Sequence, residues 1–333
     1  MDFFFSIVVP VYNRPDEVEE LLASLAAQEG SAKFELLIVE DGSTKPCKNI
    51  VEQYSSKLNI RYFTKPNTGR SDTRNYGMRE AVGSYFIFFD SDCIVTPQYF
   101  QQLEKNLTSN YSDCFGGPDA AHPSFSSTQK AINYAMTAFL TTGGIRGDKQ
   151  QLEKFKPRTF NMGFSRKVYE TVGDFNDMFG EDIDLAIRIQ NAGFRTTLYQ
   201  DVYVYHKRRV SLKRFYKQVY IFGTARVNLA LIHKGSLKMV HILPALFLLG
   251  GVALVISSIF CTPLFLAPIV LYILLLFADA ILKTRLLTTA LLAVVASCIQ
   301  VVGYGWGFIR SFIEKIILKK GLESSETLKK IYK

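Results

Sequence analysis

Residues 85–92 read Tyr-Phe-Ile-Phe-Phe-Asp-Ser-Asp, an apolar run of strand-forming residues that ends in two carboxylates. The run shows no alternation with polar residues, which is typical of a strand buried on both faces of a sheet. Two earlier apolar runs are also followed directly by polar or turn-forming residues. Residues 3–11 end at Pro10–Asn13, and Phe34–Val39 leads into Glu40–Ser43. Each buried strand therefore carries polar side chains to its carboxyl end.

Amphipathic stretches separate these runs, as the spacing of the apolar residues within 16–28 illustrates. The expected order is strand 3–11, helix 16–28, strand 34–39, helix 47–57, strand 60–63, helix 70–82 and strand 85–89. This alternation predicts an α/β fold in which helices cover both faces of a parallel sheet. Ligands bind beyond the carboxyl ends of the strands in such sheets, so the polar clusters at those ends mark a binding site.

Charge and hydropathy divide the 333-residue chain near residue 206. Residues 1–206 carry 21 Lys and Arg against 26 Asp and Glu, whereas residues 207–333 carry 18 against 4. An acidic part joined to a basic, apolar part indicates a soluble domain attached to an anionic membrane surface. It argues against a nucleic-acid-binding protein, because the basic residues lie beside long apolar runs. We expect a folded domain at 1–206, a basic interfacial helix region at 207–238, a transmembrane region at 239–310 and a basic tail at 311–333.

Three segments of the second part are long and apolar enough to span a bilayer. They lie near 240–260, 264–282 and 286–309. Three spans would place the C-terminus opposite the first domain, whereas its basic residues favour the cytoplasmic side. The sequence leaves the number of true spans and the side of the C-terminus open. Asp279 marks a cytoplasmic membrane boundary, and the alternative is an acid that acts within the membrane.

Residues 207–238 contain nine Lys and Arg and no acid, with apolar residues near helical spacing. This pattern predicts a basic amphipathic helix on the membrane, against the alternative of an ordinary solvated helix. The five cysteines are scattered without a Cys-x-x-Cys pair, which argues against a zinc site or a disulfide framework. The N-terminal residues 1–13 lack a basic region and a cleavage site, so we interpret them as a strand and not as a signal peptide.

Individual motifs at the strand ends each allow two interpretations. Asp90 and Asp92 could converge on one divalent cation such as Mg²⁺ or Mn²⁺, or form a solvated turn. Asp41 could accept a hydrogen bond from a nucleobase, or form an Asx turn. Arg74 follows the turn at Gly69 on a helix, where it could pair with phosphate or lie on the surface.

The combination of motifs is far more specific than any one of them. In order, the sequence contains Val9-Pro10-Val11-Tyr12-Asn13, Glu40-Asp41-Gly42-Ser43, Asn67 with Gly69, Arg74-Asn75 with Gly77, Asp90-Ser91-Asp92, and Glu181-Asp182. This order resembles the family 2 inverting glycosyltransferases of the GT-A fold over roughly residues 4–206. The resemblance implies a nucleotide-diphospho-sugar transferase domain with a Rossmann-like mixed sheet, followed by a helical membrane region as in the membrane-attached bacterial members.

The resemblance also implies roles for single residues. Asp182 would be the general base. The nucleotide would contact Pro10, Val11, Tyr12, Asn13, Asp41, Arg74 and Asp90. The metal ion, Mn²⁺ or Mg²⁺, would be bound by Asp90, Asp92 and His206, with a structural role as the alternative for His206. The donor-sugar and acceptor side would be formed by Gly117, Asp119, Asn161, Met162, Gly163 and Glu181.

These roles agree with the chemistry of inversion. A carboxylate on the face opposite the leaving diphosphate activates the acceptor hydroxyl, and such general-base catalysis contributes roughly 10²–10⁴-fold. A divalent cation neutralises charge on the leaving diphosphate. Glu181 and Asp182 also suit the first turn of a helix near 183–192, and a base can serve both purposes.

The processive synthases of this family carry a Gln-x-x-Arg-Trp motif, which is missing around the single tryptophan, Trp306. We therefore expect the transfer of one sugar from a nucleotide-sugar donor, by family habit UDP-linked. The acceptor would be a glycan or a lipid-linked glycan of the cell envelope, and no nucleic acid would be involved. The enzyme would be a multi-pass protein of the inner membrane, in contact with lipids, with its catalytic domain in the cytoplasm. Lys207-Arg208-Arg209 could hold a diphosphate or contact lipid headgroups.

Other functions remain open at this point. A polyprenyl-phosphate glycosyltransferase would combine the same fold with membrane segments. An inactive scaffold that binds nucleotide-sugars is disfavoured by the joint presence of Asp41, Asp90, Asp92 and Asp182. A transporter is disfavoured because three apolar segments are too few.

Overall fold

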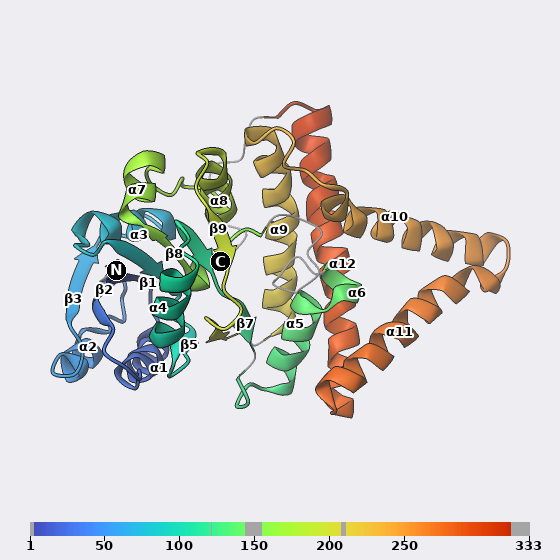
Figure 1. Cartoon of the computed structure of the whole chain (residues 1–333). Coiled ribbons are helices and arrows are strands. Elements are labelled where there is room, and N and C mark those ends of the chain that lie inside the picture. The colour runs from blue at the N-terminus through green and yellow to red at the C-terminus, as the bar shows by residue number, and fades with distance from the viewer. Residues whose placement is uncertain (1–2, 121, 144–154, 208–210, 321–333) are drawn as a thin grey trace. The chain divides into compact units, whose positions relative to one another are not determined.

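The structure is a computed structural model that describes residues 3–120, 122–143, 155–207 and 211–320 (Figure 1). The chain forms two compact units, Met1–His122 with Lys154–Lys207, and Pro123–Glu153 with Arg208–Lys333. The division after Lys207 lies next to the expected one. The segment Pro123–Glu153 differs from our expectation, because it belongs to the second unit and not to a continuous domain 1–206.

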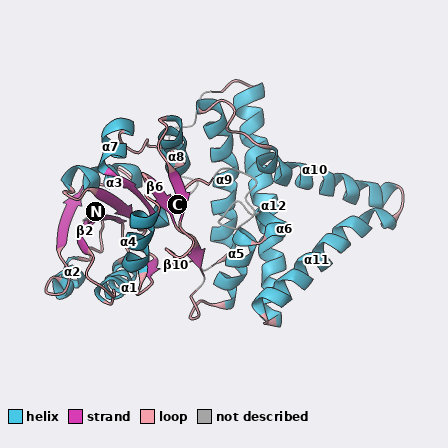
Figure 2. Ribbon diagram, viewed as in Figure 1, coloured by secondary structure: helices cyan, strands magenta, loops and turns pink. Residues whose placement is uncertain are grey.

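A seven-stranded mixed sheet forms the centre of the first unit, with the order β3-β2-β1-β4-β8-β6-β9 (Figure 2). The strands are β1 (Phe4–Val11), β2 (Lys33–Asp41), β3 (Ile60–Lys65), β4 (Tyr85–Phe88), β6 (Cys114–Gly116), β8 (Met162–Ser165) and β9 (Thr196–Leu198). Strands β1 to β4 are parallel, as the sequence predicted. Strand β8 runs antiparallel to both β4 and β6, which makes the whole sheet mixed.

Helices cover both faces of this sheet. One face carries α1 (Pro15–Ala26), α2 (Lys48–Tyr54) and α4 (Tyr99–Ser109), and the other carries α3 (Arg70–Glu80), α7 (Arg166–Val172) and α8 (Glu181–Asn191). Because side chains alternate along a strand, Ile7 and Val9 of β1 join the first core and Val8 joins the second. The unbroken apolar runs of the sequence therefore reflect burial on both sides.

A second, three-stranded sheet has the order β5-β10-β7. It consists of β5 (Cys93–Val95), β7 (Asp119–Ala120) and β10 (Val204–His206). Strand β10 runs antiparallel to β5, with His206 opposite Cys93. The pairing brings two sequence motifs together, the Asp90–Asp92 turn before β5 and the histidine at the end of β10.

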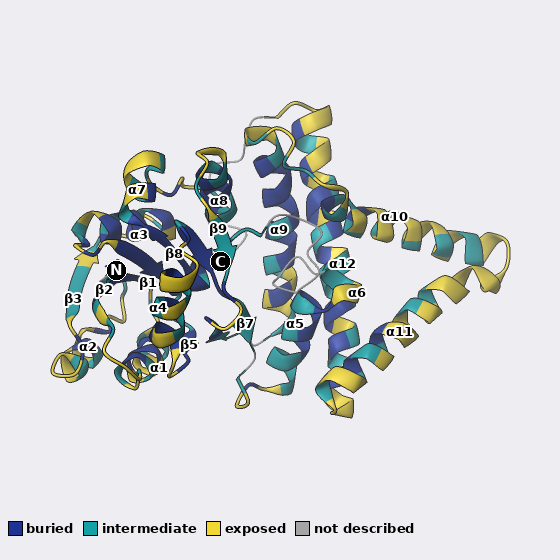
Figure 3. Cartoon of the chain, in the orientation of Figure 1, coloured by how far each residue is buried: buried dark blue, intermediate teal, exposed yellow. Residues whose placement is uncertain are grey.

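The second unit is helical. It contains α5 (Ser127–Thr137), α6 (Phe139–Thr142), α9 (Leu212–Ile232), α10 (Met239–Phe260), α11 (Ala267–Thr284) and α12 (Leu287–Phe312), with the short turns Pro263–Leu266 and Ile313–Ile317. Within the described residues, three helical stretches are long and apolar enough to cross a membrane: Met239–Phe260, Pro263–Thr284 and Leu287–Ile317. Many of the large apolar side chains of α10 and α11 are exposed (Figure 3), which indicates a membrane environment.

Helix α9 packs closely along α12. Gly223 approaches the carbonyl of Tyr304, and Gly307 approaches the carbonyl of Tyr220, so closely that a methyl group would not fit at either glycine. Apolar residues of α9 thus face a neighbouring helix, whose small residues offer a complementary surface. The expected position of 207–238 at the membrane surface stays a prediction.

Helix α5 explains why Pro123–Glu153 belongs to the second unit. Ala131 packs against Ala290 and Ala293 of α12. The hydroxyl of Tyr134 donates a 2.6 Å hydrogen bond to Asp279 of α11, which also pairs with Lys283 at 3.0 Å. Asp279 therefore has partners within its own unit.

Candidate active site

The carboxyl ends of β1, β2 and β4 form one edge of the large sheet. Because β1 pairs in parallel with both β2 and β4, the residues that follow the three strands lie next to one another. These residues are Asn13, Asp41 and the turn Asp90–Asp92. The structure thus brings together the three polar clusters that the sequence placed at strand ends.

Asp41 is buried at the end of β2 and is held by hydrogen bonds. Its Oδ1 accepts from the Lys65 ammonium at 2.7 Å and from the Thr68 amide at 2.9 Å, and its Oδ2 accepts from the Gly69 amide at 3.0 Å. The ammonium and the two amides fix the orientation of the carboxylate. Asp41 is therefore a fixed hydrogen-bond acceptor, as a residue that contacts a nucleobase should be.

The end of β1 is fixed by the loop that follows β2. The Asn13 amide donates to Ser43 Oγ at 2.9 Å, and Asn13 Oδ1 accepts from the Lys45 amide at 2.9 Å. Asn13 has a positive φ of 55°, which asparagine tolerates better than most residues. Tyr12 beside it is 47% exposed, and Pro10 and Val11 lie within the sheet. An exposed ring on a rigid turn is a surface on which a base can stack.

Arg74 is buried and joins two parts of the first unit. Its guanidinium contacts Asp90 Oδ1 at 2.8 Å and Glu181 Oε1 at 3.1 Å. Arg70, one turn earlier on α3, contacts the same Glu181 at 2.8 Å. We expected Arg74 and Asp90 to meet the nucleotide and Glu181 to meet the substrate. In the structure Arg74 contacts both Asp90 and Glu181, and Glu181 is bound by two arginines.

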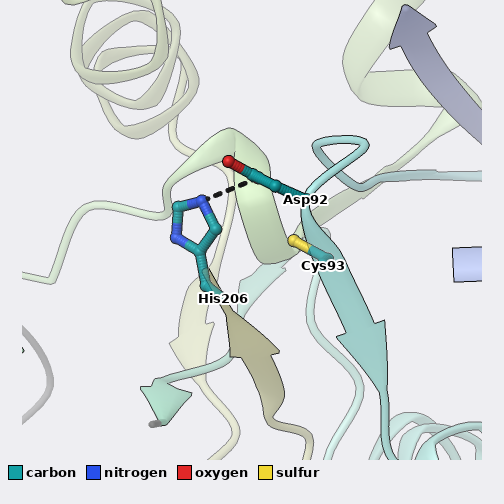
Figure 4. A group of neighbouring side chains, drawn as sticks. All are labelled: Asp92, Cys93 and His206. Atoms are coloured by element: carbon teal, nitrogen blue, oxygen red, sulfur yellow. Dashed lines mark ion pairs between the residues drawn. The ribbon is translucent and has the colours of Figure 1, made fainter. Parts of the chain in front are cut away.

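Asp92 and His206 form the pair that suits a metal ion. His206 Nε2 lies 3.1 Å from Asp92 Oδ1, and Cys93 adds a sulfur, all three ligand atoms lying within 4.8 Å of one another (Figure 4). Asp119 Oδ2 lies 3.7 Å from the other ring nitrogen of His206. A carboxylate beside the second nitrogen is the arrangement that orients metal-binding histidines.

The donor set fits the expected Mn²⁺ or Mg²⁺ through Asp92 and His206, since hard divalent cations accept carboxylate oxygen and Mn²⁺ also accepts imidazole. Asp90, which we also expected at the metal, contacts Arg74 through Oδ1, and its role at the metal stays a prediction. Asp119, which we expected on the sugar side, lies beside His206. Burial raises the pKa of the Cys93 thiol well above its usual range, and the carboxylates of Asp92 and Asp90 raise it further.

Asp182 lies in the first turn of α8, where acids are favoured by the helix dipole. Its Oδ1 accepts from the Ile183 amide at 2.8 Å, and its Oδ2 lies 3.7 Å from the Arg158 guanidinium. The carboxylate is partly exposed, so a substrate hydroxyl has access to it. Helix α8 thus carries a partly exposed carboxylate at the position that we expected for the base, while the adjacent Glu181 ties the helix to α3.

The remaining predicted residues are buried or closely packed within the first unit. Asn161 is fully buried, accepts from the Tyr99 hydroxyl at 2.6 Å and donates to the Val202 carbonyl at 2.8 Å. Gly117 packs so closely on that carbonyl that a side chain would not fit. Met162 and Gly163 belong to the buried strand β8. These residues shape the sheet edge through protein contacts.

Four charged residues of the site were absent from our expectations: Glu17, Lys65, Arg70 and Arg158. Burial raises the pKa of Glu17, and the nearby Asp92 carboxylate raises it further. In the sequence these residues look like ordinary polar positions of helices and loops, and only the fold supplies their partners. Arg208 and Arg209, which we expected at a diphosphate or at lipid headgroups, lie outside the described residues.

The chain is similar to known glycosyltransferases. The chain is 26% identical over 254 residues to glycosyltransferase AglE of Haloferax volcanii, a match that covers 74% of this chain and 81% of AglE. The chain is also 33% identical over 112 residues to the poly(ribitol-phosphate) beta-N-acetylglucosaminyltransferase TarS of Staphylococcus aureus. That match covers 33% of this chain but only 20% of TarS.

Among solved structures, the chain resembles the mannosyltransferase PcManGT from Pyrobaculum calidifontis, determined in complex with GDP-Man and Mn²⁺. The TM-score is 0.62 at 17% identity, over 91% of this chain and 88% of PcManGT. This similarity shows the fold. The family model described as glycosyl transferase family 2 matches residues 6–173, half of the chain. The protein therefore belongs to glycosyl transferase family 2 and is a glycosyltransferase with a GT-A-like domain.

Proposed function

We propose that this glycosyltransferase moves one sugar from a UDP-linked donor to a hydroxyl of a glycan or lipid-linked acceptor, with inversion and with the help of Mn²⁺ or Mg²⁺. The observation that carries the proposal is the convergence of Asp41, Asp92 and His206 in one unit, at or beside the carboxyl edge of the parallel strands. Relatives such as TarS, which is named as a poly(ribitol-phosphate) beta-N-acetylglucosaminyltransferase, support a role in the synthesis of cell-envelope polysaccharide.

The donor base is proposed to meet Asp41. Oδ1 of Asp41 already accepts two hydrogen bonds, from Lys65 and from the Thr68 amide. Among the described residues, Oδ2 accepts only one, from the Gly69 amide. One further acceptor position suits the single ring N–H of uracil or thymine. Guanine presents two adjacent donors and would need two free positions. The geometry therefore favours a pyrimidine nucleotide.

In the proposed reaction, Asp182 accepts the proton of the acceptor hydroxyl while the new bond forms at C1 of the sugar. The bond from C1 to the diphosphate oxygen breaks on the opposite face. A cation held by Asp92 and His206, once bound, would neutralise the charge on that diphosphate. Arg74 pairs with Asp90, and Glu181 links α8 to the arginines of α3. Both residues therefore act by positioning their neighbours.

We further propose that the first unit is cytoplasmic and that the apolar helices cross the inner membrane. The three candidate spans support membrane attachment. The basic character of residues 207–238 supports a cytoplasmic location for the adjacent first unit.

Calorimetry on detergent-purified protein tests the donor site. UDP should bind more tightly than GDP, and Mn²⁺ should strengthen UDP binding in the wild type but not in Asp92→Asn. Asp201→Asn is the matched control, because Asp201 is an exposed aspartate whose side chain accepts a hydrogen bond from Asn106, away from the strand-end cluster. Failure of folded protein to bind any nucleotide, with or without metal, would contradict the proposal.

The role of Asp182 is tested by turnover. Asp182→Asn should lower kcat by roughly 10²–10⁴-fold while leaving UDP affinity unchanged, because a general base acts on the acceptor and not on the donor. A loss of less than fivefold would remove Asp182 from the mechanism.

A lipid phosphate is the second candidate acceptor. Arg158 lies 3.7 Å from Asp182 and is partly exposed, which places a cation where an anionic acceptor would need one. Transfer to a polyprenyl phosphate, lost in Arg158→Gln, would favour this candidate. Transfer to a neutral hydroxyl acceptor that is independent of Arg158 would favour the first.

A further inference from the structure

Cys93 is a metal-ligating side chain that the proposed reaction does not use. It lies opposite His206 across the antiparallel pair β5 and β10, directly after Asp92 in the chain. Opposed residues of such a pair have their Cβ atoms about 4.5–5.5 Å apart. The sulfur, the ring nitrogen and the carboxylate oxygen all lie within 4.8 Å of one another. Figure 4 shows the three side chains side by side.

These three atoms are chemically unlike. Hard cations such as Mg²⁺ select oxygen, and Mn²⁺ accepts oxygen and nitrogen, whereas thiolate sulfur selects softer ions such as Zn²⁺ and Cd²⁺. In the absence of such an ion, the Cys93 thiol donates to the Phe160 carbonyl at 3.4 Å, and the Phe160 ring stacks on His206 with centroids 4.8 Å apart. The thiol therefore has an uncharged hydrogen-bond partner, and the ring of that partner residue packs on the neighbouring imidazole.

The present separations of the three ligand atoms can be compared with those around a bound zinc ion. Three donors around one tetrahedral zinc ion, at about 2.0–2.3 Å from it, lie roughly 3.3–3.8 Å apart. The Asp92 and His206 ligand atoms are 3.1 Å apart, so that pair is already close to this spacing. The sulfur has to approach by at most about 1.5 Å, which takes a rotation of the Cys93 side chain together with shifts of the Asp92 and His206 side chains.

We propose that Asp92, Cys93 and His206 form an inhibitory site for a thiophilic divalent cation, Zn²⁺ or Cd²⁺, which excludes Mn²⁺ by using the same carboxylate and imidazole. On binding, a bond forms between sulfur and the cation, and the thiol proton passes to solvent. No oxidation or reduction takes place. Binding of the thiophilic ion stands on the three side chains alone, and only its inhibitory effect rests on the proposed function.

Cadmium gives a direct readout, because sulfur ligation produces an ultraviolet charge-transfer band. Detergent-purified full-length protein, without nucleotide, should develop this band on titration with CdCl₂ and saturate at one ion per chain. The band should disappear in Cys93→Ser and persist in Cys114→Ser. Cys114 is the matched control, since it is equally buried in β6 but is not part of the group.

Competition with Mn²⁺ completes the test. The electron paramagnetic resonance signal of free Mn²⁺ reports binding, and ZnCl₂ should release bound Mn²⁺ from the wild type at lower concentration than from Cys93→Ser. Retained Mn²⁺ binding in Cys93→Ser shows that the variant is folded, and Cys93→Ala serves if the serine variant is not.

Two results would overturn the proposal: no saturable band in the wild type, or an undiminished band in both Cys93 variants. A cadmium band without nucleotide binding would leave this site standing and contradict the proposed function instead.

Discussion

At the scale of single residues, Asp41 and Lys65 form a buried ion pair whose two members depend on each other. Their side chains are 8% and 7% exposed, and they approach to 2.7 Å. Lys65→Met would leave the carboxylate buried without its cation, a change that typically costs about 3–5 kcal/mol. We expect a matching loss in the free energy of unfolding of the first unit and weaker UDP binding.

Chemical denaturation and calorimetry measure these two effects. Lys48→Met is the control, because Lys48 and its partner Glu52 are mostly exposed and 3.9 Å apart. Such surface pairs contribute little. Equal stability of Lys65→Met and Lys48→Met would show that the amides of Thr68 and Gly69 suffice to hold Asp41.

Glu35, a single buried carboxylate at the start of β2, predicts a pH dependence of stability. Burial on its own would raise the pKa of Glu35, but hydrogen bonds from Ser6, the Val82 amide and Arg61 outweigh burial, and the net pKa is lowered. A carboxyl group with a lowered folded pKa stabilises the fold above its unfolded pKa, near 4.5, and loses this contribution as the pH falls through the folded value.

Glu35→Gln should therefore reduce the free energy of unfolding by about 1–3 kcal/mol at pH 7. The difference from wild type should shrink below about pH 4.5. Denaturation curves at several pH values provide the measurement, with the exposed Glu52→Gln as control. A difference that stays constant down to pH 3 would mean that the charge of Glu35 is not what stabilises this corner of the sheet.

At the scale of elements, the contact of α9 with α12 depends on glycine. A Cβ atom at Gly307 would lie 2.2 Å from the Tyr220 carbonyl oxygen, so the two helices would have to separate. Gly307→Ala should lower the thermal unfolding temperature in detergent, at a cost of about 1–3 kcal/mol. Gly251→Ala on α10, where no atom lies within 4 Å of the added group, should leave it unchanged. A similar loss in both variants would contradict the packing explanation, because alanine has a higher helix propensity than glycine and nothing lies near Gly251.

The elements also differ in how far the sequence determines them. Strands β1, β2 and β4 are predictable because each is an apolar run followed by polar residues. Strands β6 and β8 have three and four residues, too few to show a period, and they exist because distant strands pair with them. The helix α4 was missed for a different reason, since its apolar residues follow β5 without a recognised boundary.

The residues of the site also differ in whether the sequence pattern or only the fold places them. The positions of Asp41, Asp92 and His206 at strand ends could be predicted, because each follows or ends a short run of strand-forming residues. Arg70 and Lys65 could not, because an isolated charge in a sequence gives no information about its partner. Glu181 lies 111 residues from Arg70, and only the fold brings the two together.

At the scale of the whole molecule, the orientation of the membrane helices is open to a direct test. Cys261 is exposed in the turn after α10, whereas Cys298 lies within α12. If residues before α10 are cytoplasmic, one crossing brings Cys261 to the outer side of the inner membrane. A maleimide that does not cross this membrane should label Cys261 in intact cells, and Cys261→Ser should abolish the labelling. Labelling that appears only after cell lysis would contradict the proposed orientation.

The placement of α5 in the second unit has a consequence for how the chain is made. Tyr134 of α5 contacts the Leu276 carbonyl, 142 residues further along the chain. At a synthesis rate of about 5–20 residues per second, α5 leaves the ribosome roughly 7–30 s before its partner is made. During that interval its apolar face has no native cover, and a chaperone or the bilayer surface has to shield it. The unit that binds the membrane thus starts to emerge long before the first segment able to enter it.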